Sequence, residues 1–542
     1  MKRLSIYLHS ALLFGITLLA LVAGATQVPT SGSHTVLVLP FENASAAPGL
    51  QWISEAFPEV LGQRLSSPSL YVISREDRHY AFDRMGIPTA VRPSRATLYR
   101  IAEQMDADYV VLGEYSFDGQ LFRANAQVLD MRTLRLSKQH MAAGPLVSLI
   151  DIQREIAWQV LHSIDPQINV SRQEFLREAV PVRLDAFENY IRGVLATTRQ
   201  EKTRYFREAL RLNPQYTPVM LALGKTYFAG REYEQAANWF ARIPRTDTCA
   251  AEANFMLGLS SYYSGHFDKA EQAFRFTESR LPLIEVYNNL GVIASRRGKK
   301  SASVDYFQKA VQADPSDPDY HFNLAVALYR NGEPANAARQ LRDTLSRRPG
   351  DTEAKSLLET INAGFGRTID PSQPIVQVRV PLERIKRNYD ENSYRQLAIE
   401  ITNAIEASLA NADPQTHAAF HSDRGHELLN QGFVAEAEKE LKEAIMRDPT
   451  SAEAHAGLAR VAENRNDAAR AHSEANASLR LKPNVDAYLV LARLEMANNN
   501  LDAANDAIGR ALALEPENAV AQAARRTLEE KRSGQSQSIP QP

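Results

Sequence analysis

A pattern of small, large apolar and proline residues repeats every 33 or 34 positions through most of the carboxyl-terminal two thirds of the chain. Each unit opens with glycine or alanine and carries a second small residue 12 positions later. In most copies a large apolar residue follows four positions after that second small residue. The opening residues are Gly224, Gly258, Gly291, Ala325, Gly425, Ala459 and Ala492. A proline follows by 24 positions in all but the first unit. Apolar residues between these markers recur at helical spacing, so each unit predicts two antiparallel helices.

Close crossing of two helices explains why these residue types recur at these positions. Small residues sit where the backbones approach, and large apolar residues fill the space beside them. Proline after the second helix begins the next helix, where its missing N–H costs nothing. Stacked hairpins share a continuous core that a single hairpin cannot form. The seven units in phase resemble the tetratricopeptide repeat (TPR) family, which implies an all-α solenoid of helix-turn-helix repeats, and residues 186–214 resemble a degenerate eighth unit.

The register breaks once, so the array is predicted to form two blocks. Residues 183–366 make the first block, residues 367–409 an insertion, and residues 410–532 the second block with a capping helix over 519–531. Within the insertion, the alternation at 375–380 predicts a short strand or an extended segment lying on the helices, and 394–409 predicts a long amphipathic helix. The polar, proline-containing residues 533–542 predict a disordered tail.

A different pattern over residues 34–168 predicts a small α/β domain. Short β-branched and apolar runs at 35–41, 70–74 and 108–115 read as strands, and helical spacing recurs at 50–65, 96–102 and 146–164. An Asp118-Gly119 turn predicts a hairpin whose second strand is 121–129. The phrases HTVLVLPFENAS, LYVISRED and IAEQMDADYVVLGEYSFDGQLFRANAQVLDMRT resemble the amino-terminal-like domain of TolB. TolB continues with a β-propeller where this chain continues with helices, so the resemblance carries over no partners.

The first 25 residues have the pattern of a signal peptide. A basic start at Met1-Lys2-Arg3 precedes an apolar run at 11–22 and the small residues Ala23-Gly24-Ala25. This predicts export with cleavage near Ala25 and a periplasmic or secreted location. The alternative counts the apolar stretch from Leu4 and gives an amino-terminal membrane anchor.

Composition narrows the function classes. The 542 residues carry a net charge of −2, so no global electrostatic attraction to nucleic acid is expected. Cys249 is the only cysteine, which excludes an intramolecular disulfide and a thiolate metal cluster within one chain. No Gly-x-Ser-x-Gly elbow, Walker loop or kinase signature is present in the sequence, so an enzyme is not predicted and no cofactor or metal is assigned.

Two weaker constellations remain. His417 and His421 have the spacing of two metal ligands on one helix face, but no glutamate lies between them, and exposed repeat histidines are the simpler interpretation. Polar residues near the predicted strand ends could line a small-molecule site, although no glycine-rich phosphate loop follows the first strand and solvated loop residues explain them as well. These residues are Glu42, Asp77, Arg78 and His79.

The first helix of each hairpin is expected to line the concave face, where a partner would bind. Aromatic, asparagine and arginine residues on that face suit an extended peptide, because asparagine pairs with backbone amides, arginine with carboxylates, and aromatic rings bury apolar side chains. The candidate partner-binding residues are Phe255, Met256, Tyr262, Asn288, Asn289, Arg296, Phe322, Asn323, Tyr329 and Arg330. Asn289 and Asn323 match the asparagine spacing of chaperone-binding TPR domains, but the accompanying lysine and arginine pattern is absent.

These observations favour an exported, non-enzymatic scaffold or adaptor that binds a protein or peptide through its repeats, in a bacterial envelope complex with membrane-anchored envelope proteins among the candidate partners. One alternative is a ligand-sensing protein whose α/β domain binds a small molecule. Another is an assembly factor that self-associates. Homo-oligomerisation and the partner's identity stay open at this stage.

Overall fold

The computed structural model describes residues 34–45, 47–67, 70–87, 94–166, 168, 170–177, 182–364, 380–409, 411–431 and 434–536. The predicted signal peptide, residues 375–379 of the predicted alternation and the tail beyond 536 lie outside these ranges. The described residues fall into two compact units. One contains Val182–Tyr394, and the other contains Thr30–Pro181 together with Arg395–Pro542.

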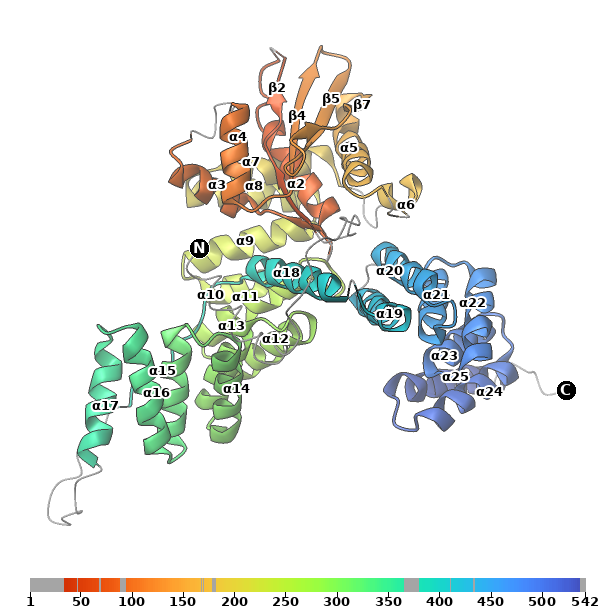
Figure 1. The fold of residues 1–542 in the computed structure, drawn as a ribbon. Coiled ribbons are helices and arrows are strands. Elements are labelled where there is room, and N and C mark those ends of the chain that lie inside the picture. Colours follow the sequence, from red (N-terminus) through yellow and green to blue (C-terminus); the bar gives the residue numbers. More distant parts are fainter. Residues whose placement is uncertain are drawn as a thin grey trace. The chain divides into compact units, whose positions relative to one another are not determined.

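A mixed sheet organises the amino-terminal domain (Figure 1). Strand β1 lies between β3 and β4 and is parallel to both, while β4 and β5 form the predicted hairpin with Phe117 opposite Phe122. Gly119 in its turn has φ +97°, which glycine adopts without strain. The strands are β1 (His34–Val38), β2 (Glu42–Asn43), β3 (Leu70–Val72), β4 (Tyr109–Phe117), β5 (Phe122–Asp130), β6 (Arg135–Leu136) and β7 (His140–Gly144).

Helices cover both faces of this sheet, so the domain has three layers. On one face, Phe82 of α3 and Ile101 of α4 pack with Leu37 of β1 in one apolar cluster. On the other, Phe57 of α2 stacks on Phe41 with ring centroids 4.0 Å apart, and α5 packs on β5 and β7. The helices are α2 (Ile53–Leu65), α3 (Arg75–Arg84), α4 (Arg95–Gln104), the short 3-10 turn η2 (Leu146–Ser148), α5 (Leu149–Ile164) and α6 (Arg172–Leu176). The prediction of a small α/β domain is confirmed.

Antiparallel hairpins form the first array, in the unit that contains Val182–Tyr394. Its helices are α7 (Leu184–Leu195), α8 (Arg199–Leu212), α9 (Thr217–Ala229), α10 (Tyr233–Phe240), α11 (Ala250–Tyr263), α12 (Phe267–Arg280), α13 (Ile284–Arg296), α14 (Lys300–Ala313), α15 (Pro318–Arg330), α16 (Pro334–Arg347) and α17 (Thr352–Gly364). The predicted degenerate unit is the hairpin of α7 and α8. The all-α solenoid prediction is confirmed.

The second array repeats this arrangement within the other unit. It consists of α19 (Pro414–Gln431), α20 (Val434–Arg447), α21 (Ala452–Asn464), α22 (Ala468–Leu481), α23 (Val485–Ala497), α24 (Leu501–Leu514) and α25 (Ala519–Ser536). Helix α25 packs on α23 and α24 in the manner of a cap and extends five residues beyond the predicted end at Lys531. Helix α18 (Glu391–Leu409) occupies the predicted amphipathic stretch.

Size matching at the helix crossings explains the repeated small residue. A methyl group added to Gly291 would lie 2.7 Å from Phe307, and the same conflict recurs between Gly258 and Phe274. Where the opening residue is already alanine, the large partner is smaller, as in Ala325 and Leu341. In the first array, glycine with phenylalanine and alanine with leucine therefore fill a similar volume at the crossing.

We predict that Gly291→Ala lowers the free energy of unfolding by about 1–2 kcal/mol, because overpacking against Phe307 outweighs the gain in helix propensity. Adding Phe307→Leu should recover part of this loss by recreating the alanine–leucine pairing. Gly509→Ala is the matched control, since a methyl group there meets nothing within 4 Å and should stabilise helix α24 slightly. Thermal unfolding followed by circular dichroism measures all three changes. Equal destabilisation at Gly291 and Gly509 would contradict the crossing argument.

Candidate functional site

The inner face of the first array holds a segment of the same chain. Residues 380–390, which we call the groove segment, contain no helix or strand and lie across the first helices α11, α13 and α15. We call this inner face, together with the start of α17, the groove. Seven predicted partner-binding residues contact the groove segment: Phe255, Asn288, Asn289, Arg296, Phe322, Asn323 and Arg330.

The other three predicted residues lie beside these contacts. The Tyr262 hydroxyl accepts a hydrogen bond from Arg296, and Tyr329 lines a small cavity with Arg330 and Val380. Met256 is buried in α11. It occupies the repeat position of Asn289 and Asn323, so the polar face of the groove ends where an apolar side chain replaces asparagine. The binding of a separate partner at these ten residues stays a prediction.

Two asparagines hold the backbone of the groove segment. Asn323 Oδ1 accepts from the Arg384 N–H and its Nδ2 donates to the Arg384 carbonyl, both at 2.7 Å. Asn289 makes the same pair with Lys386, both at 2.8 Å. Asn288 adds a donor to the Arg384 carbonyl at 3.0 Å. All three asparagine side chains are fully buried. They recognise peptide groups whatever the side chain is, which is how an extended chain is bound without sequence dependence.

The spacing of these contacts matches an extended backbone. Asn289 and Asn323 lie one repeat apart, and they bind residues two apart in the groove segment. In an extended chain, alternate residues direct their N–H and C=O groups to the same side. Successive first helices therefore bind successive alternate residues, with the groove segment running from the later repeats toward the earlier ones.

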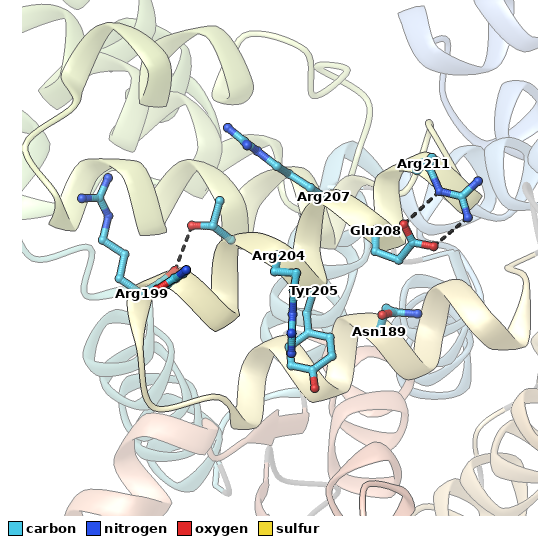
Figure 2. Close-up of a pocket in the computed structure, with 9 residues that line it drawn as sticks. Asn189, Arg199, Arg204, Tyr205, Arg207, Glu208 and Arg211 are labelled. Carbon is cyan, nitrogen blue, oxygen red and sulfur yellow. Dashed lines mark hydrogen bonds and ion pairs between the residues drawn. The ribbon is translucent and has the colours of Figure 1, made fainter.

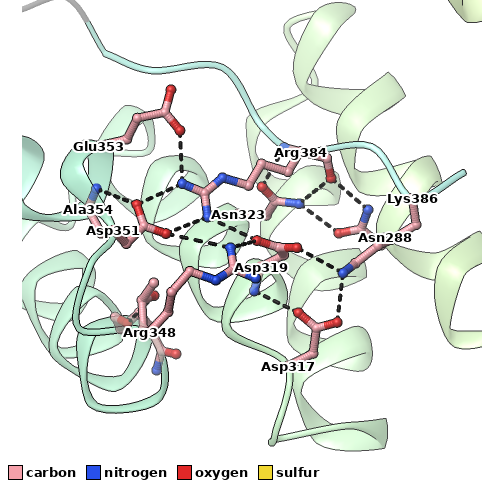
Figure 3. A network of polar contacts seen from close by, with 12 residues as sticks. Asn288, Asp317, Asp319, Asn323, Arg348, Asp351, Glu353, Ala354, Arg384 and Lys386 are labelled. Atoms are coloured by element: carbon pink, nitrogen blue, oxygen red, sulfur yellow. Dashed lines mark hydrogen bonds and ion pairs between the residues drawn. The ribbon is translucent and has the colours of Figure 1, made fainter.

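The Arg384 side chain lies at the centre of a charged network (Figure 3). Its guanidinium group makes two hydrogen bonds with Asp351, at 2.7 and 2.8 Å, and single ones with Asp319 at 2.9 Å and Glu353 at 2.8 Å. It also lies over the ring of Phe322, 3.7 Å from the centroid. The planar guanidinium suits this arrangement, because it can donate in its plane while stacking on an aromatic face.

Helix starts supply the acidic side of this network. Asp317 is the N-cap of α15, Asp319 lies in its first turn, and Asp351 accepts from the Ala354 N–H at the start of α17. Carboxylates are favoured at helix N-termini. Lys386 uses the same groups, with Nζ 2.6 Å from Asp317 and 3.0 Å from Asp319. The residues that cap the helices thus also bind the two cations of the groove segment.

A pocket of opposite charge receives Glu383. Its side chain is fully buried and pairs with Arg330 and with Arg296, the latter at 3.5 Å. Ser295 donates to the same carboxylate, and Arg330 Nη2 donates to the Pro381 carbonyl at 3.0 Å. The groove therefore contains a cationic pocket for Glu383 and an anionic pocket for Arg384 and Lys386.

Ionisation behaviour follows from these contacts. Hydrogen bonds from Arg384 are the main reason that the pKa of Asp351 lies below its ordinary value. Burial opposes ionisation of Asp319, but hydrogen bonds from Arg348 and Lys386 outweigh it and keep its pKa well below the usual range. Glu285, in the first turn of α13, shows the opposite shift. Burial is the main cause and repulsion from Asp390 adds to it, and together they raise the pKa of Glu285 to about 7. The groove thus contains carboxylates whose pKa values are shifted in opposite directions.

The binding residues that sequence reasoning missed belong to the groove segment itself and to the acidic helix starts. The prediction allowed an extended segment on the helices at 375–380, whereas the described contacts run from Val380 to Tyr389. The available signal was the Glu-Arg-x-Lys sequence at 383–386, set between repeats, together with the acidic residues Asp317, Asp319 and Asp351 at predicted helix starts.

Two of the weaker sequence candidates, Arg78 and His421, make structural contacts. Arg78 is buried in α3, not solvated in a loop, because it pairs with Glu55 and donates to the Val38 carbonyl at 3.0 Å. His421 Nδ1 lies 2.7 Å from Glu440 of the neighbouring helix, the same inter-helix contact that joins His455 to Glu474. Among the described residues, no group of three or more histidine, cysteine, aspartate or glutamate side chains is arranged to hold a metal.

Two of the surface hollows outside the groove contain ion pairs. An arginine-rich hollow on α8 is drawn in Figure 2; Arg211 pairs there with Glu208 at 2.6 Å, and Arg199 pairs with Glu232. The inner face of the second array forms the other, where Arg493 pairs with Glu463. No helix within the described ranges is both long enough and apolar enough to cross a bilayer.

Comparisons with known proteins identify the helical hairpins. Models of the tetratricopeptide repeat match residues 203–256, 255–318, 288–352 and 422–486, so these regions are tetratricopeptide repeats. MamA, in a crystal structure, is 18% identical, with a TM-score of 0.29, over 34% of this chain and 98% of that chain. YrrB, titled a TPR protein with an unusual peptide-binding site, is 16% identical, with a TM-score of 0.30, over 33% of this chain and 92% of that chain.

A curated relative also matches. The Peroxisomal targeting signal receptor of Candida albicans (strain SC5314 / ATCC MYA-2876) is 24% identical over 213 residues, which cover 38% of this chain and 36% of the relative. The chain thus spans about a third of that relative's length.

We predict that Glu285→Gln stabilises the first array in a pH-dependent way. Between pH 4.5 and 7 the folded state keeps a proton that the unfolded state has lost, so stability falls as pH rises through this window. Glutamine does not titrate, so its advantage over glutamate should grow through that window and reach up to about 3 kcal/mol by pH 8. Urea unfolding at pH 5 and pH 8 measures the difference. Glu359→Gln, on the exposed side of α17, is the control, and an equal effect of both variants would refute the assignment.

Proposed function

We propose that this chain is an exported, non-enzymatic scaffold that binds extended segments of protein partners along the concave face of its tetratricopeptide repeats, within a bacterial envelope complex. The observation that carries the proposal is the pairing of Asn289 and Asn323 with the backbone of an extended segment. Each asparagine satisfies both the N–H and the C=O of one residue, which is peptide recognition carried out on the chain's own sequence.

Burial adds weight to a binding role. Asn288, Asn289 and Asn323 are fully buried polar side chains on the inner face of the helices, where apolar residues would stabilise the hairpins equally well. Their hydrogen bonds go chiefly to the groove segment rather than to the helix backbone. The buried asparagine amides therefore support the interpretation that this face binds peptide groups.

The remaining parts of the proposal rest on sequence. The signal-peptide pattern over residues 1–25 supports a periplasmic or secreted location. The sequence phrases within residues 34–168 resemble the TolB amino-terminal-like domain, and we propose this domain as a second contact surface within the complex. The curated relative is named a receptor, and protein recognition by this chain would belong to the same broad class. The ligand-sensing alternative has less support, since Arg78, one of its four candidate residues, is committed to Glu55 and the Val38 carbonyl.

The test is partner recovery from cross-linked envelope fractions with tagged full-length chains. Because the groove segment uses the same asparagines, weakening them in the natural chain would affect internal and external binding alike. Both chains therefore carry Arg384→Ala and Lys386→Ala, which free the groove. Adding Asn289→Ala and Asn323→Ala should then reduce recovery at least about tenfold, because four backbone hydrogen bonds are lost.

Asn336→Ala on the exposed side of α16 is the matched control and should leave recovery unchanged. Circular dichroism checks that every chain stays helical. Equal recovery with and without Asn289 and Asn323 would contradict peptide binding in the groove.

A further inference from the structure

The groove carries fixed charges that would be costly to leave without counter-charges. Arg296 and Arg330 form a cationic pocket around Glu383, whose side chain is fully buried. Asp317, Asp319 and Asp351 surround Arg384 and Lys386, which are themselves about four-fifths buried. Removing the groove segment would leave two neighbouring arginines without this carboxylate and the acidic cluster without two of its cations. Unpaired charges in a half-buried groove are strongly disfavoured.

An incoming segment therefore has to replace these charges as well as the backbone contacts. The asparagines accept any peptide group, so they set direction and register but not sequence. Sequence is read by the two charged pockets, at positions 383, 384 and 386. Beside these pockets the groove makes few demands at Leu382, which is 62% exposed, and at the exposed Asn388. Arg387 is also exposed, but its guanidinium group lies over the rings of Phe228 and Tyr263, 5.2 and 5.8 Å from their centroids.

We propose that the groove segment is a displaceable internal ligand, and that the natural partner presents an extended segment with the same pattern of an acidic residue, arginine, any residue and lysine. This inference rests on the proposed peptide-binding function and names the chemistry of the partner. Binding is an exchange of one Glu-Arg-x-Lys segment for another, because an empty groove is the unfavourable state. A basic peptide without the leading acidic residue would leave Arg296 and Arg330 unmatched.

Covalent attachment gives the internal ligand an advantage in this exchange. A tethered segment competes at an effective concentration on the order of millimolar, so an external segment of equal intrinsic affinity binds the natural chain weakly. Substitutions that weaken only the groove segment should raise the apparent affinity for an external peptide. The increase should equal the factor by which the groove segment had lowered the fraction of chains with a free groove.

The experiment uses full-length chains and a fluorescently labelled peptide with the sequence of residues 380–390. Fluorescence anisotropy measures its Kd for the natural chain and for the chain carrying Arg384→Ala and Lys386→Ala. We expect the altered chain to bind the peptide at least tenfold more tightly. Leu382→Ala, at an exposed position, is the control and should bind the peptide as the natural chain does. A peptide with alanine at position 384 should bind the altered chain at least tenfold more weakly.

Three outcomes would overturn the inference. The first is equal peptide affinity for the natural and altered chains, with circular dichroism showing both folded. The second is peptide binding that survives Asn289→Ala and Asn323→Ala in the altered chain. The third is a natural chain that dimerises in sedimentation and becomes monomeric on Arg384→Ala and Lys386→Ala, which assigns the groove to a second copy. If the first occurs while envelope partners still depend on Asn289 and Asn323, the scaffold function stands and only the motif fails.

Discussion

The paired hydrogen bonds between a groove asparagine and one peptide unit are the interaction on which the rest of the site depends. They fix the register of the groove segment, and only in that register does Arg384 reach Asp351 and Phe322 while Glu383 enters the pocket of Arg330. A shift of one residue would direct the backbone groups away from the asparagines and would place Leu382 or Arg384, in place of Glu383, beside Arg296 and Arg330. Backbone recognition and charge recognition therefore support each other.

The helical frame and the groove obey separate constraints. Gly291 and Phe307 match in volume at a helix crossing, and the alanine–leucine crossing at Ala325 reaches the same fit by other means. Neither of these packing pairs determines what the groove binds. Asn289, two positions before Gly291, contributes a polar group to the inner face of the same helix. One helix thus combines a packing position that tolerates little change with a binding position whose substitution should leave the fold intact.

Sequence predicts the frame because its determinants are local and repeated. The spacing from Gly291 to Phe307 lies within one hairpin, and its recurrence sets the phase in which Asn289 and Asn323 face inward. The position of the groove segment could not be predicted, because Asn288 and Arg384 are 96 positions apart in the sequence and the groove segment has no periodicity. Only complementary charge connects them: acidic helix caps at one place and Arg384 with Lys386 at another. The burial of Arg78 against Glu55 is non-local in the same way.

Hydrogen exchange of the groove segment tests the central claim most directly. Residues 380–390 form no helix or strand, so their protection has to come from the asparagines, which accept from the Arg384 and Lys386 amides. Mass spectrometry of peptides covering 380–390 should show protected amides in the natural chain and loss of that protection on Asn289→Ala with Asn323→Ala. Exchange at the rate of a free peptide in the natural chain, or protection that persists in the variant, would contradict the account.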